Sequence, residues 1–124
     1  MKKIVLFILV VTLMTVQPVL ALQIANPASV NCSNVGGHLV IERRGDGGEY
    51  GICYFEDNKA CEEWALFRGE CPKGGVKSTG FDSVDKKYCV WMGGKVKLGA
   101  KSVCTFKGGS KCSTLALYNG SCLQ

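Results

Sequence analysis

The residues of this 124-residue chain best suited to chemistry are its eight cysteines, and their spacing is regular. They form two sets of four: Cys32, Cys53, Cys61 and Cys71, then Cys89, Cys104, Cys112 and Cys122. The intervals within the first set are 21, 8 and 10 residues, and within the second set 15, 8 and 10. No Cys-x-x-Cys pair occurs, and His38 is the only histidine. The pattern therefore predicts disulfides and no metal site.

The sequence gives only weak evidence for a catalytic site. A Ser-His-Asp or Cys-His site would need His38, for which we expect an exposed position on a strand, and the duplicated pattern accounts for all eight cysteines. Glu62 and Glu63 are neighbours in a predicted first helical turn, where the helix dipole favours carboxylates. Trp64 is expected in the core. We predict no enzymatic activity and no cofactor.

The segment 43–50 is the first candidate for a binding surface, because it is a predicted hairpin tip and loops often carry function. It includes an Arg-Gly-Asp tripeptide, which integrin ligands use. The candidate binding residues are Arg43, Arg44, Asp46, Glu49 and Tyr50, with a second set at Lys95, Lys97 and Lys101.

Charge is distributed unevenly along the chain. Residues 22–72 hold four basic and eight acidic side chains, a net charge of −4, whereas residues 73–124 hold nine lysines and two aspartates, a net charge of +7. Either the two halves dock on each other, or the lysines face an anionic envelope component, which includes peripheral membrane contact. Nucleic acid is not predicted as a partner, because the basic half has no arginine and no aromatic-rich motif.

The first 21 residues have the features of a secretory signal peptide. Met1-Lys2-Lys3 is a basic start, an apolar run follows from Ile4 to Val16, and Ala21 ends a small-residue cleavage motif. The run is shorter than the roughly 20 residues of a membrane span. We predict cleavage after Ala21 and a periplasmic or secreted protein.

The predicted mature chain consists of two repeats of one unit, over residues 22–72 and 73–124. A Gly-Gly pair follows the first cysteine of each set by four residues, at Gly36-Gly37 and Gly93-Gly94. The matching intervals and glycines indicate a tandem duplication. Each unit has only about 50 residues, a size at which disulfides compensate for a small core.

Each unit is predicted to be a helix, a β-hairpin and a second helix. In the first unit the expected ranges are a helix from Asn26-Pro27 to Gly36-Gly37, strands over 38–42 and 50–55 around a turn at 45–48, and a helix over 60–67 ended by Gly69. In the second unit, after a linker over 72–80, Asp82 or Ser83 caps a helix and residues 95–98 form a strand. The fold class is α+β: small, disulfide-rich, with hairpins able to join in one antiparallel sheet.

Helix length limits the disulfide pairing. If Cys61 and Cys71 lie at opposite ends of a ten-residue helix, they are about 15 Å apart, beyond the roughly 7 Å that a disulfide allows. The remaining pairings are Cys32–Cys61 with Cys53–Cys71, which we favour, or Cys32–Cys71 with Cys53–Cys61.

The first unit also resembles a known family. The segments NPASVNC with Gly-Gly (26–37), DGGEYGIC (46–53) and CEEWALFRGEC (61–71) are similar to a bacterial family of small exported proteins, domain of unknown function 333, whose members are often labelled hemolysins. The resemblance implies an exported, cysteine-containing domain. In the second unit Glu62-Glu63-Trp64 is replaced by Ser113-Thr114-Leu115.

Together these observations predict a non-enzymatic exported protein that binds an unknown protein or an anionic envelope component. A membrane-active, hemolysin-like protein and a secreted peptidase inhibitor are the alternatives.

Overall fold

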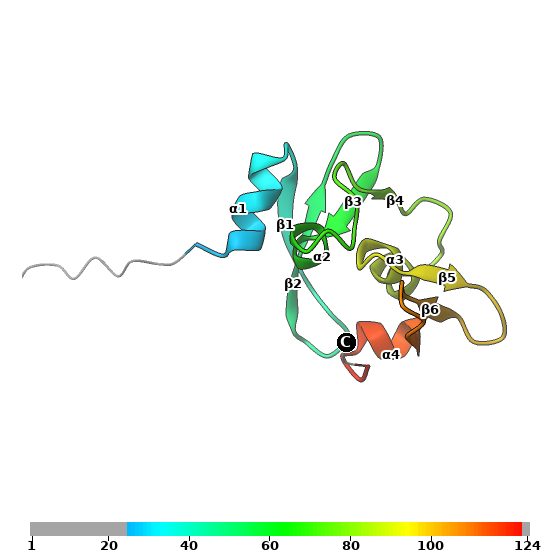
Figure 1. Ribbon diagram of the computed structural model, residues 1–124. Coiled ribbons are helices and arrows are strands. Elements are labelled where there is room, and N and C mark those ends of the chain that lie inside the picture. Colours follow the sequence, from blue (N-terminus) through cyan, green and yellow to red (C-terminus); the bar gives the residue numbers. More distant parts are fainter. Residues whose placement is uncertain (1–24, 123–124) are drawn as a thin grey trace, which may run out of the picture.

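A computed structural model describes residues 25–122 of the chain, so the predicted signal peptide lies outside the described residues. The fold is α+β with four disulfides, which confirms the expected fold class (Figure 1). Within residues 25–122, no helix has both the length and the apolar character needed to cross a membrane.

The first unit is a four-stranded antiparallel sheet with two short helices. Its elements are α1 (Pro27–Asn34), β1 (His38–Arg43), β2 (Glu49–Tyr54), β3 (Lys59–Glu62), α2 (Glu63–Phe67) and β4 (Val76–Lys77), with sheet order β1-β2-β3-β4. As predicted, Asn26 caps α1 and Pro27 occupies its first turn, and the hairpin turn follows β1. The predicted linker contributes β4, which pairs with β3.

The second unit repeats the order helix, three strands, helix. Its elements are α3 (Val84–Trp91), β5 (Lys95–Lys97), β6 (Val103–Thr105), β7 (Lys111–Ser113) and α4 (Thr114–Tyr118). Ser83 is the N-cap residue of α3, although its side chain donates or accepts no capping hydrogen bond.

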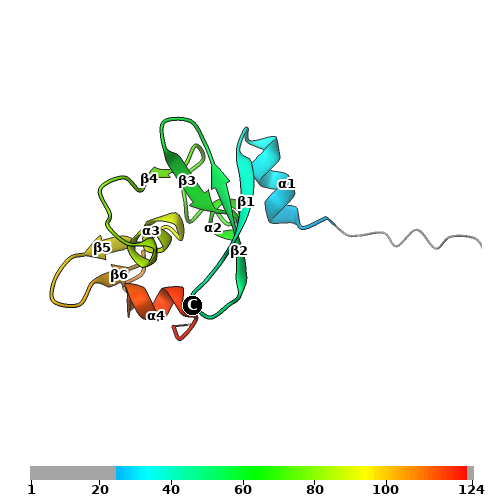
Figure 2. The same ribbon diagram turned by 180° about the vertical axis from the view of Figure 1, so that it is seen from behind.

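The two hairpins do not join into one sheet, contrary to the expectation. The strands form separate sheets of four and three strands. Helix α3 packs against strands of both sheets and lies between them (Figures 1 and 2). Its Tyr88 and Trp91 are buried in one cluster with Ile52 of the first sheet and Cys104 of the second. The larger core of the molecule is therefore shared between the two units.

The predicted helix over residues 60–67 is shorter than expected. Ala60 and Cys61 belong to β3, where Cys61 pairs with Cys53 of β2 in the sheet register. Helix α2 has five residues, and the chain turns back at Gly69, which has a φ of +77°. The sheet therefore places Cys61 beside the returning chain.

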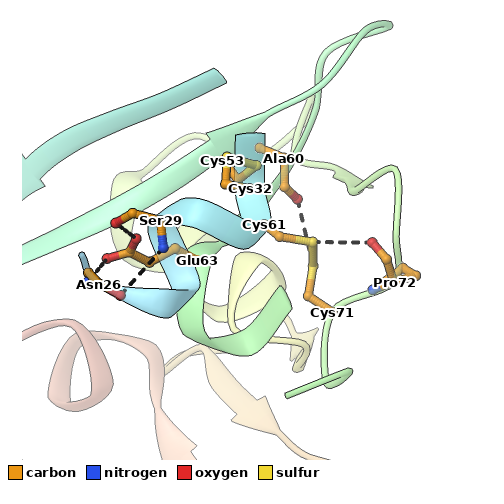
Figure 3. Close-up of a disulfide and its surroundings, with 9 residues drawn as sticks. All are labelled: Asn26, Ser29, Cys32, Cys53, Ala60, Cys61, Glu63, Cys71 and Pro72. Carbon is orange, nitrogen blue, oxygen red and sulfur yellow. Dashed lines mark hydrogen bonds between the residues drawn. A yellow bond between two sulfur atoms is a disulfide. The ribbon is translucent and has the colours of Figure 1, made fainter. Parts of the chain in front are cut away.

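The predicted disulfide pairings are both wrong for this reason. In the first unit the bonds join Cys32 to Cys53 and Cys61 to Cys71 (Figure 3). In the second unit they join Cys89 to Cys104 and Cys112 to Cys122. The Cα atoms of Cys61 and Cys71 are 5.9 Å apart, because no ten-residue helix separates them. Both units use the same pairing, as a tandem duplication predicts.

The Gly-Gly pair of each unit has two separate structural roles. Gly36 and Gly93 end α1 and α3 in the left-handed region, with φ of +86° and +91°. A Cβ atom on Gly37 would collide with the sulfur of Cys53, and one on Gly94 would collide with the sulfur of Cys104. The second glycine of each pair is therefore required to make room for the disulfide between the first two cysteines of its unit.

This contact predicts that Gly37→Ala destabilises the protein by about 1–3 kcal/mol, the usual cost of overpacking a core. Urea unfolding of the mature protein measures the change. Gly99→Ala is the matched control, since nothing lies closer than 3.9 Å to a Cβ placed there. Equal stability of the two variants would contradict the role assigned to Gly37.

Candidate functional site

The hairpin predicted to be a binding surface is docked against the second unit. Its tip reaches the C-terminal end of α4 (Figures 1 and 2). Tyr50 is only 6% exposed and lies edge-on to Tyr88 of α3 and to Tyr118 of α4, with ring centroids 5.0 and 6.3 Å away. Such edge-to-face pairs stabilise beyond the area they bury. Tyr50 thus belongs to the contact between the units and is not available at the surface.

The tip itself makes close contacts with the end of α4. The Tyr118 hydroxyl donates a hydrogen bond to the carbonyl oxygen of Arg43 at 3.0 Å. A Cβ atom on Gly45 would collide with Asn119, and one on Gly120 would collide with the Asp46 carboxylate. The Arg-Gly-Asp segment therefore faces the second unit, and its central glycine leaves room for this approach.

Within the tip, Asp46 closes the turn. One of its carboxylate oxygens accepts hydrogen bonds from the Gly48 N–H at 2.8 Å and from Nε of Arg44 at 3.3 Å. The hydrogen bond from Gly48 and the charge of Arg44 lower the pKa of Asp46. Two other candidate residues, Arg43 and Glu49, remain largely exposed, with side chains 74% and 64% accessible. A binding role for these two stays a prediction.

The two halves of opposite charge do dock, but aromatic rings rather than ion pairs join them. The ion pairs among the described residues link Arg43 to Glu49, Arg44 to Asp46, Arg68 to Glu70 and Lys86 to Asp82, each within one unit. The charge asymmetry is therefore left on the surface.

A cleft of about 230 Å³ lies where the two units meet. It is lined by charged residues of both signs and by aromatic residues: Arg44, Glu49, Tyr50, Glu62, Glu63, Trp64, Arg68, Tyr88 and Met92. Three of the predicted binding residues, Arg44, Glu49 and Tyr50, are thus brought together with α2 and α3. The other side chains of the cleft were not selected as binding residues from the sequence.

Trp64 is the main exposed aromatic side chain at this cleft. The expectation of a buried Trp64 is wrong: it is 37% exposed and lies edge-on to Phe67, which is 48% exposed. The five-residue helix α2 buries Ala65 and Leu66 instead. Leu115, at the corresponding position of α4, is also exposed. This position therefore faces solvent in both units.

Glu63 is a buried carboxylate that ties α2 to α1. It accepts hydrogen bonds from the Ser29 hydroxyl at 2.6 Å and from the Asn26 side-chain amide at 3.3 Å (Figure 3). A Cβ atom on Gly51 would lie 2.7 Å from the carboxyl carbon of Glu63, so this glycine makes space for the carboxylate. Residues from all three segments that resemble the family (26–37, 46–53 and 61–71) thus form one structural cluster.

The second unit has the same helix-to-helix contact with the polarity reversed. Here the hydroxyl belongs to the short helix, and Thr114 donates to the Asp85 carboxylate of α3 at 2.5 Å. A buried carboxylate–hydroxyl pair therefore joins the two helices of each unit.

Glu62 is buried at the N-terminus of α2, where its carboxylate accepts a hydrogen bond from the Ala65 N–H at 2.9 Å. Burial raises the pKa of Glu62, and the nearby charge of Glu63 acts in the same direction. The helix-capping hydrogen bond from Ala65 acts in the opposite direction but does not offset the effect of burial. Both adjacent glutamates are therefore engaged in holding α2.

A third carboxylate, Glu42 of β1, was not selected from the sequence. Its two oxygens accept hydrogen bonds from the hydroxyls of Tyr50 and Tyr54, each at 3.1 Å. Burial, together with Glu42, raises the pKa of Tyr54 to about 12. Tyr50 and Tyr54 are four residues apart on one strand, so their side chains point to the same face of the sheet. This spacing is the sequence signal for a pair of hydroxyls that share one carboxylate.

The three lysines predicted to bind a partner are exposed, but they lie in two separate places. Lys95 and Lys97 lie on β5, one of the two edge strands of the second sheet, where lysines also prevent edge-to-edge pairing of strands. Lys101 lines a separate cavity of about 590 Å³ beside α3 and α4. His38 is exposed at the start of β1. Among residues 25–122, no three His, Cys, Asp or Glu side chains are placed to hold a metal ion.

The contact between Gly45 and Asn119 gives a test of hairpin docking. We expect Gly45→Ala to destabilise the protein by about 0.5–1 kcal/mol, because the Asn119 side chain must move aside, and Asn119→Gly to restore part of that loss in the double variant. Urea unfolding of the two single variants and the double variant forms a double-mutant cycle. Additive effects, with no recovery, would show that the two residues do not meet.

Glu62 gives a prediction for pH. The unfolded state ionises near pH 4.3, whereas the folded pKa is raised, so the folded state binds more protons between these values and stability falls as pH rises. Glu62→Gln keeps the capping acceptor without the charge. We therefore expect the variant to gain stability relative to the wild type between pH 4 and pH 7, measured by urea unfolding. A constant difference, or one of the opposite sign, would contradict the raised pKa.

Comparisons with known proteins agree with the resemblance found in the sequence. The family model described as a domain of unknown function (DUF333) matches residues 23–70. Two curated relatives, each named uncharacterized protein YdbJ, come from Escherichia coli strain K12 and from Escherichia coli O6:H1; each is 34% identical over 56 residues, 45% of this chain. The chain covers 64% of the length of each relative. No solved structure matches the chain. The residues matched by this family model, 23–70, lie within the first unit.

Proposed function

We propose that this protein is an exported, non-enzymatic binding protein and that the cleft around Trp64 contacts a protein partner in the cell envelope. The observation that carries the proposal is the exposure of Trp64, which is 37% accessible beside Phe67 on a helix held by disulfides. Exposed tryptophans next to arginines are typical anchors of protein interfaces.

The charges of the cleft favour a polypeptide over an anionic lipid surface. Arg44 and Arg68 line it together with the carboxylate of Glu49. Arg68 is also held in place by two hydrogen bonds to Glu70, both 3.1 Å long. A site that presents both signs of charge suits a partner with matched charges of both signs.

The disulfides support the exported part of the proposal. Four disulfides use all eight cysteines of the chain. Such bonds persist in oxidising compartments such as the periplasm and the extracellular medium. They also keep a binding surface rigid in a protein whose units are too small to bury a large core.

The engagement of the acidic groups supports a non-enzymatic role. Glu63 is held by two hydrogen bonds from α1, and Glu62 caps α2. Both side chains line the cleft, but these hydrogen bonds engage their carboxylates. Their buried positions are explained by the attachment of α2 to the rest of the unit.

The proposal predicts that Trp64→Ser abolishes capture of an envelope protein by the immobilised mature protein. Truncating an anchor tryptophan costs about 2 kcal/mol or more, so the Kd for the captured partner should rise at least tenfold. Mass spectrometry of the captured proteins, followed by titration with the purified partner, measures the effect.

Leu115→Ser is the matched control, because Leu115 is the exposed equivalent of Trp64 on α4. This variant should capture the same protein as the wild type with unchanged affinity. If Trp64→Ser retains full affinity for every captured protein, the cleft is not the binding site.

A further inference from the structure

The groove of the second unit that holds the hairpin has a counterpart in the first unit. In the second unit the hairpin lies against Tyr88 of α3 and against Tyr118, Asn119 and Gly120 at the end of α4. Counting from the cysteines of each unit, the equivalent positions are Asn31 of α1 and Phe67, Arg68 and Gly69 at the end of α2.

These equivalent residues line a cavity of about 380 Å³ between α1 and the end of α2. Val35 and Leu66, the counterparts of Met92 and Leu117, also line it. Gly69 and Gly120 share the left-handed conformation, with φ of +77° and +73°. The first unit therefore has the same groove, formed by the same elements in the same conformation.

The groove of the first unit is open, whereas that of the second unit is filled. A Cβ atom on Gly120 would collide with Asp46 of the hairpin, but a Cβ atom on Gly69 would meet no atom within 4 Å. Phe67 is 48% exposed, whereas its counterpart Tyr118 is only partly exposed and donates a hydrogen bond to the hairpin. No described segment of the chain occupies the place that the hairpin fills in the second unit.

The hairpin of the second unit is shorter and points away from the groove of the first unit (Figures 1 and 2). Strands β5 and β6 have three residues each, whereas β1 and β2 have six. The first two cysteines of the second unit are 15 positions apart, six fewer than the 21 positions in the first unit. The chain thus has two grooves of one kind and one hairpin long enough to fill them.

We propose that the groove formed by Asn31, Val35, Leu66, Phe67, Arg68 and Gly69 binds the β-hairpin tip of another polypeptide. The tip has the chemistry of residues 43–50 of this chain, with an aspartate-closed glycine turn followed by a tyrosine. The donor is a protein that carries one such unit, because its hairpin has no second unit to cover it. A second copy of this chain is not the donor, since its own Tyr50 is buried.

Charge supports this occupant. In the second unit the Asp46 carboxylate lies beside Gly120, next to the uncharged Asn119. In the first unit Arg68 takes the place of Asn119, and Lys73 lines the same cavity. An aspartate at the incoming tip would therefore meet the Lys73 ammonium and the Arg68 guanidinium, which it would share with Glu70, and hydrogen bonds between ionised groups are the stronger ones. Arg68 lines both this groove and the cleft assigned above, but the groove proposal does not depend on that function.

The test is binding of a synthetic hairpin to the full mature protein. The probe is a fluorescent, backbone-cyclised peptide of residues 38–54 with serine in place of Cys53, titrated by fluorescence anisotropy. We expect saturable binding that weakens at least tenfold with Phe67→Ala and at least threefold when the peptide carries Asp46→Asn. Leu115→Ala is the control and should leave binding unchanged.

A second variant blocks the groove without removing a contact. Gly69→Asn tolerates the left-handed backbone and adds a side chain where the free protein has open space. It should keep the wild-type melting temperature and lose peptide binding. Absence of binding up to about 1 mM peptide, a limit near −4 kcal/mol, would overturn the proposal. So would binding that neither variant weakens, which would place the peptide elsewhere.

Sedimentation velocity of the protein alone tests the choice of donor. We expect a monomer at concentrations that saturate the peptide site. A concentration-dependent dimer that Phe67→Ala abolishes would overturn the assignment, because a second copy would then supply the hairpin.

Discussion

The packing of Tyr50 against Tyr88 and Tyr118 is the interaction on which the arrangement of the whole molecule depends. It joins a strand of the first unit to both helices of the second, and the hydrogen bond from Tyr118 to Arg43 fixes the tip beside it. Units of about 50 residues bury too little surface to be stable through a hydrophobic core of their own. The shared aromatic core, with Ile52, extends the buried surface across both units.

Disulfides and glycines set the shape of each unit and so make this packing possible. Within each unit a disulfide ties the first helix to the middle of the sheet, and the glycine after the helix makes space for its sulfurs. The buried pairs Ser29–Glu63 and Thr114–Asp85 then hold the short helix against the long one. Each unit thereby presents a groove between its two helices, and only one groove is filled by the chain itself.

Local features of the fold could be predicted from the sequence, and features set by distant contacts could not. The Asn26-Pro27 helix start and the glycine-rich turn after β1 follow from local backbone preferences. Residues 59–62 have no helix-breaking residue before α2, so only pairing with β2 makes them a strand and brings Cys61 to Cys71. The burial of Tyr50 depends on Tyr118, which lies 68 positions later in the sequence. For the same reason the sequence identified Arg44, Glu49 and Tyr50 as candidates but not their neighbours Trp64 and Arg68.

The most direct test of this account is a solution NMR measurement of the mature protein with labelled tyrosines. The account predicts nuclear Overhauser effects from the Tyr50 ring to the rings of Tyr88 and Tyr118, and from the Gly45 Hα protons to Tyr118, whose ring carbon would lie 3.3 Å from a Cβ placed on Gly45. A Tyr50 ring with no such effects and with the chemical shifts of an exposed tyrosine would contradict it. The hairpin would then be free, and the two grooves would no longer differ.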